Sequence, residues 1–278
     1  MFKIVKPVGL GVALLAGISV PAVAADLYEP QVVEAPAPVQ VVPVATGGWY
    51  IRGDLDYHWS NFRGADYITY GPPPGTNTVN DGKLDGAWSI GGGVGYKINS
   101  YLRTDVTADY LFKSDFSGST AGSSCGGAGP CSSVERGGYS GWLLLANAYA
   151  DLGTYHGITP YVGAGIGGAH IKWDDLHDPN TTERNGGTSS WRFAYALMAG
   201  ASYCLTHNIS LDVGYRFTHI NGGRMFEYAP IAGPGFDHGM NVNEVRAGLR
   251  YSFGGNSGDG CEEPQVAYQP PAPAPVYK

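Results

Sequence analysis

The sequence predicts an all-β protein: an eight-stranded antiparallel up-and-down transmembrane β-barrel with short periplasmic turns and long extracellular loops. Eight aromatic-rich segments of alternating polarity recur between Trp49 and Phe253, and the gaps between them alternate long and short. After the first 24 residues no apolar run long enough for a spanning helix remains. The chain holds 43 Gly and 19 Tyr among 278 residues but only 15% charged residues. A soluble domain usually carries about 25% charged residues, so strands that cross an outer membrane fit better.

The first 24 residues have the features of a signal peptide. Lys3 and Lys6 precede an apolar stretch at 8–20 that is too short to span a membrane, and Ala22-Val-Ala24 is a small-residue cleavage pattern. We therefore expect export of the chain and exclude residues 1–24 from the fold.

The remaining chain divides into three parts by composition. Pro-rich segments flank the alternating region, and we expect both to be extended in the periplasm. The predicted parts are a lead-in at 25–47, the barrel at 48–253 and a tail at 254–278.

Each strand is predicted from a stretch of alternation bounded by Gly, Pro, Asn, Asp or Ser. The predicted strands are 48–59, 86–98, 101–113, 140–153, 159–173, 190–204, 208–221 and 241–253. The short turns are 99–100, 154–158 and 205–207, and the long loops are 60–85, 114–139, 174–189 and 222–240.

The last strand separates its two faces most clearly. Val245, Ala247, Leu249, Tyr251 and Phe253 share one face, and Glu244, Arg246, Gly248, Arg250 and Ser252 share the other. The same parity in the first, third and seventh strands places further charges inside, whereas the Gly- and Ala-rich fifth strand does not reveal its faces.

Charges of both signs are therefore expected inside the barrel. Eight strands leave a bore that side chains nearly fill, and buried charges must be paired. We predict an ion-pair plug rather than an open pore. Its predicted members are Arg52, Asp54, Asp56, Arg103, Asp105, Asp109, Asp212, Arg216, Arg246 and Arg250.

Aromatic residues near the strand ends are expected to form girdles at the two membrane surfaces. The expected members are Trp49, Trp59, Trp88, Tyr101, Tyr110, Trp142, Trp173, Trp191 and Tyr251.

Four cysteines in an exported chain indicate two disulfides. Cys125 and Cys131 bracket a Gly-rich pentapeptide, and Cys204 and Cys261 follow the sixth and eighth strands, so these are the expected pairs. A metal site at Cys125 and Cys131 is the alternative, although the spacing is wider than C-x-x-C and no His lies nearby.

The chain resembles the eight-stranded opacity-protein and OmpA-transmembrane barrels, and most of all the alphaproteobacterial outer-membrane surface-antigen branch. The motifs that carry the resemblance begin at Gly48-Trp-Tyr-Ile-Arg-Gly53, Pro160-Tyr-Val-Gly, Asn208-Ile-Ser-Leu and Val245-Arg-Ala-Gly. The resemblance implies an outer-membrane location and contact with lipid, lipopolysaccharide and the barrel-insertion machinery. It also implies that Leu249, Tyr251 and Phe253 form the C-terminal insertion signal.

The function expected from these features is non-enzymatic: support of envelope integrity and display of surface loops for contact or adhesion. Peptidoglycan or a host surface are further expected partners. The net charge of −7 gives no reason to expect nucleic-acid binding, and no cofactor is implied. A narrow porin-like channel is the first alternative. A lipid A-modifying enzyme is the second alternative, because the segment 215–221 faintly resembles a strand of the outer-membrane barrel lipases. In that family a serine nucleophile stands two residues after the histidine, whereas this chain has Asn221 two residues after His219.

Overall fold

The computed structural model describes residues 47–70, 74–122, 131–179, 184–227 and 232–253. The expected signal peptide, the tail and all of the lead-in except Gly47 lie outside the described residues. Within these ranges no helix is long and apolar enough to cross a membrane.

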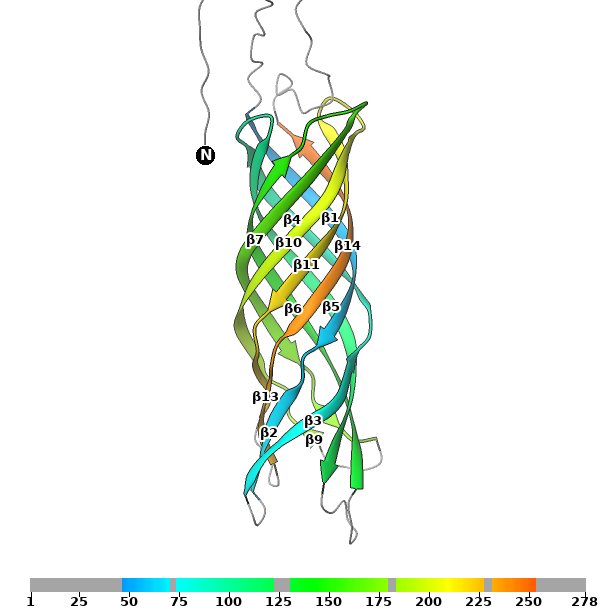
Figure 1. Cartoon of the computed structure of the whole chain (residues 1–278), viewed down its shortest axis with the longest axis vertical. Coiled ribbons are helices and arrows are strands. Elements are labelled where there is room, and N and C mark those ends of the chain that lie inside the picture. Colours follow the sequence, from blue (N-terminus) through cyan, green and yellow to red (C-terminus); the bar gives the residue numbers. More distant parts are fainter. Residues whose placement is uncertain (1–46, 71–73, 123–130, 180–183, 228–231, 254–278) are drawn as a thin grey trace, which may run out of the picture. The chain divides into compact units, whose positions relative to one another are not determined.

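Eight long antiparallel strands form a closed ring (Figure 1). They are β1 (Gly48–Phe62), β4 (Ala87–Lys97), β5 (Leu102–Gly122), β6 (Cys131–Asp151), β7 (Ile158–Trp173), β10 (Ser189–Cys204), β11 (Ile209–Ile220) and β14 (Met240–Ser252). They pair in the order β5-β4-β1-β14-β11-β10-β7-β6, and pairing between β5 and β6 closes the ring. All eight predicted strands are confirmed, and β5 and β6 extend well beyond their predicted ends.

The stagger of the strands fixes the width of the ring. Starting at Trp59 of β1, each residue can be followed to its register partner on the next strand, once around the ring. This path returns to β1 at Trp49, so the stagger of the barrel is ten residues. For eight strands, this stagger gives a tilt of about 40° and a backbone radius of about 8 Å. Such a bore is narrow enough for side chains to fill.

The outer face of the ring is apolar. Ile51, Leu55, Val106, Leu197 and Val245 each expose more than 40% of their surface. At this tilt, the ten residue-to-residue steps from Trp49 to Trp59 rise by about 25 Å, which matches the apolar band of an outer-membrane barrel. The strand length and the exposed face therefore both suit a membrane span.

The short turns lie at one end of the ring, and polar side chains bond to their backbone. The Asn99 side-chain oxygen accepts hydrogen bonds from the backbone N–H groups of Tyr101 and Leu102, both at 2.9 Å. The Thr206 hydroxyl accepts one from the Ile209 N–H at 3.1 Å. These local bonds satisfy backbone groups that the ladders leave unpaired.

The long connections lie at the other end, where predicted, but they contain paired strands. These strands are β2 (Ala65–Thr69), β3 (Gly75–Leu84), β8 (Leu176–His177), β9 (Arg184–Asn185), β12 (Gly223–Phe226) and β13 (Ala232–Asp237). Together with the outer parts of β5 and β6 (114–122 and 131–139) they form a structure that we call the outer collar.

The outer collar continues the barrel wall, because each hairpin pairs with its neighbours. β13 pairs with β2, β3 with β5, and β6 with β8. An isolated bridge between Gly187 and Phe226 joins the remaining two hairpins. The expectation of unpaired loops at these positions was therefore wrong for much of their length. The backbone partners come from other hairpins, which local sequence patterns do not reveal.

Candidate functional site: the filled interior

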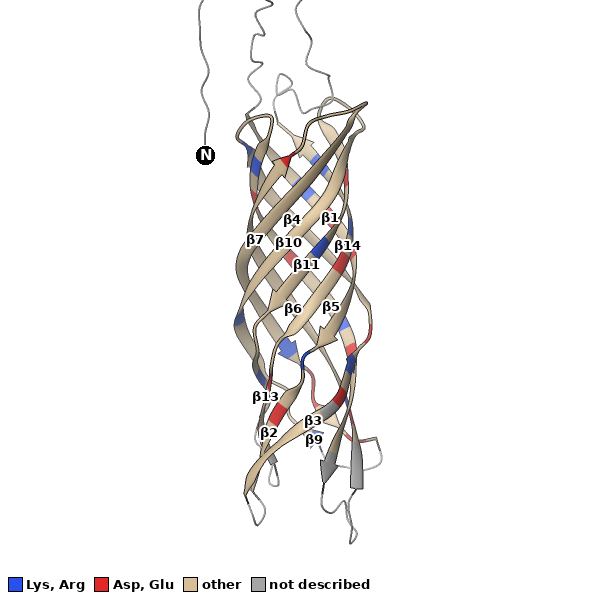
Figure 2. Ribbon diagram, viewed as in Figure 1, with Lys and Arg blue, Asp and Glu red and all other residues tan. Residues whose placement is uncertain are grey.

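The ten predicted interior residues all point into the ring, and none exposes more than 7% of its surface. Charged residues are set into the barrel walls between the two ends (Figure 2). The ten residues come from β1, β5, β11 and β14, whose alternation brings every second side chain inward.

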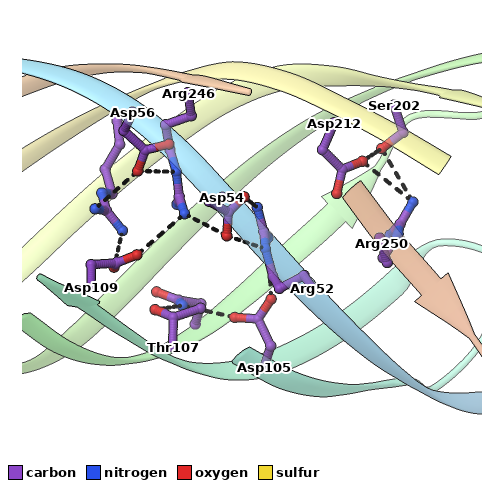
Figure 3. Close-up of polar contacts among 12 residues, drawn as sticks. Arg52, Asp54, Asp56, Asp105, Thr107, Asp109, Ser202, Asp212, Arg246 and Arg250 are labelled. Carbon is purple, nitrogen blue, oxygen red and sulfur yellow. Dashed lines mark hydrogen bonds and ion pairs between the residues drawn. The ribbon is translucent and has the colours of Figure 1, made fainter. Parts of the chain in front are cut away.

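Arg52 and Arg246 form the centre of the ion pairs (Figure 3). The Arg52 guanidinium lies 2.7 Å from Asp54 and 3.3 Å from Asp105. Arg246 reaches Asp54 at 3.1 Å, Asp56 at 3.2 Å and Asp109 at 3.7 Å. Each arginine thus faces more than one carboxylate.

Arg216 extends these contacts toward the outer collar. It lies 2.7 Å from Asp109 and 3.7 Å from Asp56, and it makes a bidentate contact with Glu244. Glu244 is fully buried on β14. The sequence pattern placed it on the inner face, but it was left out of the predicted ion-pair plug.

A second group of charges lies nearer the short turns. Arg103 pairs with Asp151 at 3.0 Å and with Asp212 at 3.9 Å, and Arg250 reaches Asp212 at 3.5 Å. The Arg103 guanidinium lies 4.4 Å from the ring centre of Tyr149 and 4.6 Å from that of Tyr161. Such cation–π contacts help to offset the desolvation of a buried guanidinium. Asp151 was missed because no inner face was assigned to the strand predicted at 140–153.

We call these twelve charges the ion-pair layer. Its members are Arg52, Asp54, Asp56, Arg103, Asp105, Asp109, Asp151, Asp212, Arg216, Glu244, Arg246 and Arg250.

Inward-facing glycines make room for the ion-pair layer. A Cβ at Gly91 would lie 1.8 Å from a carboxylate oxygen of Asp109, and one at Gly248 would lie 2.1 Å from an oxygen of Asp54. The acidic side chains occupy the space that a larger residue on the neighbouring strand would fill. Some of the glycine enrichment of the sequence therefore serves the interior.

The interior is not polar throughout. On β6, β7 and β10 the inward side chains are largely apolar, including Leu143, Leu145, Ile171, Ala196 and Met198, all at most 6% exposed. On β7, glycine and alanine hide the alternation on which the sequence analysis depends.

An aromatic cluster fills the interior where the barrel wall meets the outer collar. The ring centre of Trp173 lies 5.7 Å from those of Phe116 and Tyr139 and 6.2 Å from that of Phe62. We call these four residues the aromatic layer. Trp173 is 1% exposed, so its prediction as a girdle residue was wrong. It is the last residue of β7, and its parity directs it inward.

A buried charge pair ties the outer collar to the barrel. The Arg192 guanidinium lies 2.8 Å from Asp237 of β13, and the Trp173 indole N–H donates to the same carboxylate at 3.2 Å. Burial raises the pKa of Asp237, while the adjacent Arg192 opposes that rise. The pair links the wall strands β7 and β10 to the hairpin β12–β13.

The predicted insertion-signal residues all lie on the outer face. Leu249 is 54% exposed, Tyr251 43% and Phe253 48%. Their parity agrees with a lipid-facing pattern, and their use as a signal stays a prediction.

Cys204 at the end of β10 is disulfide-bonded. Cys125 and Cys261 lie outside the described residues, and of Cys131 only the backbone is described. Both predicted pairings therefore stay predictions.

The comparisons with known proteins agree with this architecture. The outer membrane protein beta-barrel domain family matches residues 10–253. An uncharacterised protein of Brucella abortus is 38% identical, with 83% of this chain and 92% of that protein covered. The 25 kDa outer-membrane immunogenic protein of Brucella canis is 28% identical, with 87% and 95% covered. The solved structure of the outer membrane protein OprG from Pseudomonas aeruginosa is similar at 14% identity and a TM-score of 0.45, with 75% and 98% covered. The chain therefore belongs to the outer membrane protein β-barrel domain family and is located in the outer membrane.

Proposed function

We propose that this chain is a closed, non-enzymatic outer-membrane barrel that supports envelope integrity and presents its outer collar for contact or adhesion. The filled interior is the observation that carries the proposal. The ion-pair layer and the aromatic layer follow one another along a bore of about 8 Å backbone radius. A narrow porin-like channel would need a continuous water-filled path through both layers.

The outer collar supports the second half of the proposal. Its hairpins are paired edge to edge, so a partner would meet a surface that is ordered before binding. Because the surface is already ordered, the entropic cost of ordering it does not weaken the binding of a partner. Lipopolysaccharide, a host surface and, on the other side, peptidoglycan are the proposed partners, and the barrel-insertion machinery is the proposed partner during assembly.

The enzyme alternative has less support. His219 lies on the outer wall, and its ring nitrogen Nδ1 is 2.7 Å from the Asn241 side-chain oxygen. Two residues after His219 stands Asn221, whose amide is not a nucleophile. An amide also lacks the charge with which a carboxylate would stabilise an imidazolium.

Rescue of a deletion strain tests the proposed function. One strain receives the full chain, and the other receives a barrel in which tight turns replace 63–84, 115–138, 174–188 and 222–238. Leakage of a periplasmic marker and sensitivity to bile salts are measured, and heat-modifiable gel mobility checks folding. Rescue by both chains is expected, with loss of adhesion only in the trimmed barrel. An intact envelope in the deletion strain would contradict the structural role.

A further inference from the structure

The outer aromatic girdle is interrupted at three strands: at β7, where His170 packs against Trp191, and at β11 and β14. Register and tilt place the outward residues Trp59, Trp88, Phe112, Trp142 and Phe193 within about 5 Å of one another in height. Each of the five exposes between 38% and 55% of its surface.

At the same height, β11 and β14 carry a histidine and an asparagine instead of aromatic residues. His219 and Asn241 are register partners and are joined by the 2.7 Å contact between Nδ1 and the side-chain oxygen. One step toward the membrane, the Tyr215 hydroxyl donates to the side-chain oxygen of Asn243 at 2.6 Å. We call His219, Asn241 and Asn243 the polar notch.

The hydrogen bonds within the polar notch leave a defined set of groups facing the lipid. An amide oxygen can only accept, so His219 Nδ1 donates to Asn241, and in the neutral form of the ring Nε2 is then an acceptor. Both asparagine oxygens are occupied, so their NH₂ groups are the remaining donors. The ring of Tyr195, with its centre 5.1 Å from that of His219, packs beside the histidine.

We propose that the polar notch binds the acylated glucosamine part of an outer-leaflet glycolipid, that is, of lipopolysaccharide. Acyl carbonyl oxygens lie at the hydrocarbon boundary and accept hydrogen bonds from the two asparagine NH₂ groups. A hydroxyl or amide N–H of the glycolipid donates to His219 Nε2. The notch residues carry no lysine or arginine, so their chemistry matches this uncharged region rather than a phosphate.

Donor and acceptor chemistry separates the glycolipid from a diacyl phospholipid. The ester carbonyls of a phospholipid accept hydrogen bonds but donate none, which would leave the His219 acceptor without a partner at the edge of the hydrocarbon. A polar group left unbonded away from water is costly. The proposal depends on the outer-membrane location and not on closure of the lumen.

Lipid retention tests the proposal. The full chain and a His219→Phe, Asn241→Leu variant are extracted from lipopolysaccharide-containing membranes and washed, and the retained lipopolysaccharide and phospholipid per barrel are measured by mass spectrometry. The variant is expected to retain about fivefold less lipopolysaccharide, the ratio that corresponds to one net hydrogen bond. Phospholipid retention is expected to stay the same.

His170→Phe is the matched control. His170 is a half-buried outward histidine at a similar height on β7, and it packs against Trp191 with a centre distance of 5.1 Å. This control should retain lipopolysaccharide like the unchanged chain. If the double variant folds poorly by gel mobility, His219→Leu alone removes the Nε2 acceptor and keeps both amides. Equal retention in variant and control, or an equal loss of both lipids, would overturn the proposal.

Discussion

Single residues in the interior are constrained by the space that neighbouring strands leave. Gly248 illustrates this, because a Cβ at this position would lie 2.8 Å from the Gly53 carbonyl oxygen as well as 2.1 Å from Asp54. The Asp54 carboxylate would have to move away from Arg52 and Arg246, both of which it contacts. Packing and electrostatics are therefore coupled at one backbone position.

Gly248→Ala is expected to lower the free energy of unfolding by about 1–3 kcal/mol, the usual cost of overpacking. Gly53→Ala is the matched control. Gly53 lies on the adjacent strand, and an added Cβ would meet nothing within 4 Å. It should change stability by no more than about 0.5 kcal/mol. Equilibrium urea unfolding in lipid vesicles measures both variants. Equal effects would mean that the ion-pair layer tolerates displacement of Asp54.

His58, unlike Gly248, is an interior residue whose replacement is not expected to lower stability. The ring is fully buried next to Tyr139, and neither ring nitrogen has a hydrogen-bond partner within the described residues. Burial of an unbonded polar group usually costs about 1–3 kcal/mol. His58→Phe is therefore expected to leave the free energy of unfolding unchanged or to raise it by up to about 2 kcal/mol. Loss of stability in the same urea assay would show that the histidine makes a bond that matters.

At the scale of elements, the seam between β2 and β13 holds two collar hairpins together. His238 Nε2 lies 2.9 Å from the Asp66 carboxylate, and the Thr78 hydroxyl donates to the same group at 3.1 Å. The hydrogen bond from His238 lowers the pKa of Asp66. The two side chains are half exposed, so the His238–Asp66 contact stabilises only the local structure of the outer collar.

The pH dependence of this seam follows from the direction of that shift. Since the Asp66 pKa is lower in the folded chain, the stabilisation is present above the unfolded value of about 3.9 and is lost as the pH falls through the folded pKa. In a ¹³C NMR titration the Asp66 carboxyl should titrate below the ordinary value. In His238→Leu its midpoint should move up toward that value. An unchanged midpoint would assign the shift to another group.

The elements also show what the sequence could and could not predict. From Glu244 onward, β14 alternates inward polar or charged residues with outward apolar ones, so its faces were predictable there. β7 was not, because glycine and alanine occupy positions on both faces. Pairing between collar hairpins joins segments far apart in the chain, such as β13 with β2, and no local period encodes it. Glu244 was on the predicted face, but its partner Arg216 became evident only from the register of β11 with β14.

At the scale of the whole molecule, the proposed closure of the barrel depends on two barriers in series. In this proposal the ion-pair layer blocks the bore through charges that are costly to separate, and the aromatic layer blocks it through packed rings where the barrel wall meets the outer collar. Water must pass both barriers to cross the membrane. Removal of one barrier should therefore leave the barrel closed. A barrel that only its charges seal would instead open when the ion-pair layer is removed.

Three variants test this in planar bilayers. Arg52→Ala with Asp54→Ala opens space in the ion-pair layer and removes one charge of each sign, so the net charge does not change. Asp105 loses its ion pair with Arg52 but keeps the hydrogen bond from Asn147. Phe116→Ala with Trp173→Ala opens the aromatic layer. Each pair alone is expected to show no steady current, whereas the fourfold variant should conduct, because only there is the path continuous. Heat-modifiable mobility shows that each variant is folded. A steady current from the first pair alone would mean that the aromatic layer does not seal the bore, and silence of a folded fourfold variant would place the barrier elsewhere in the interior.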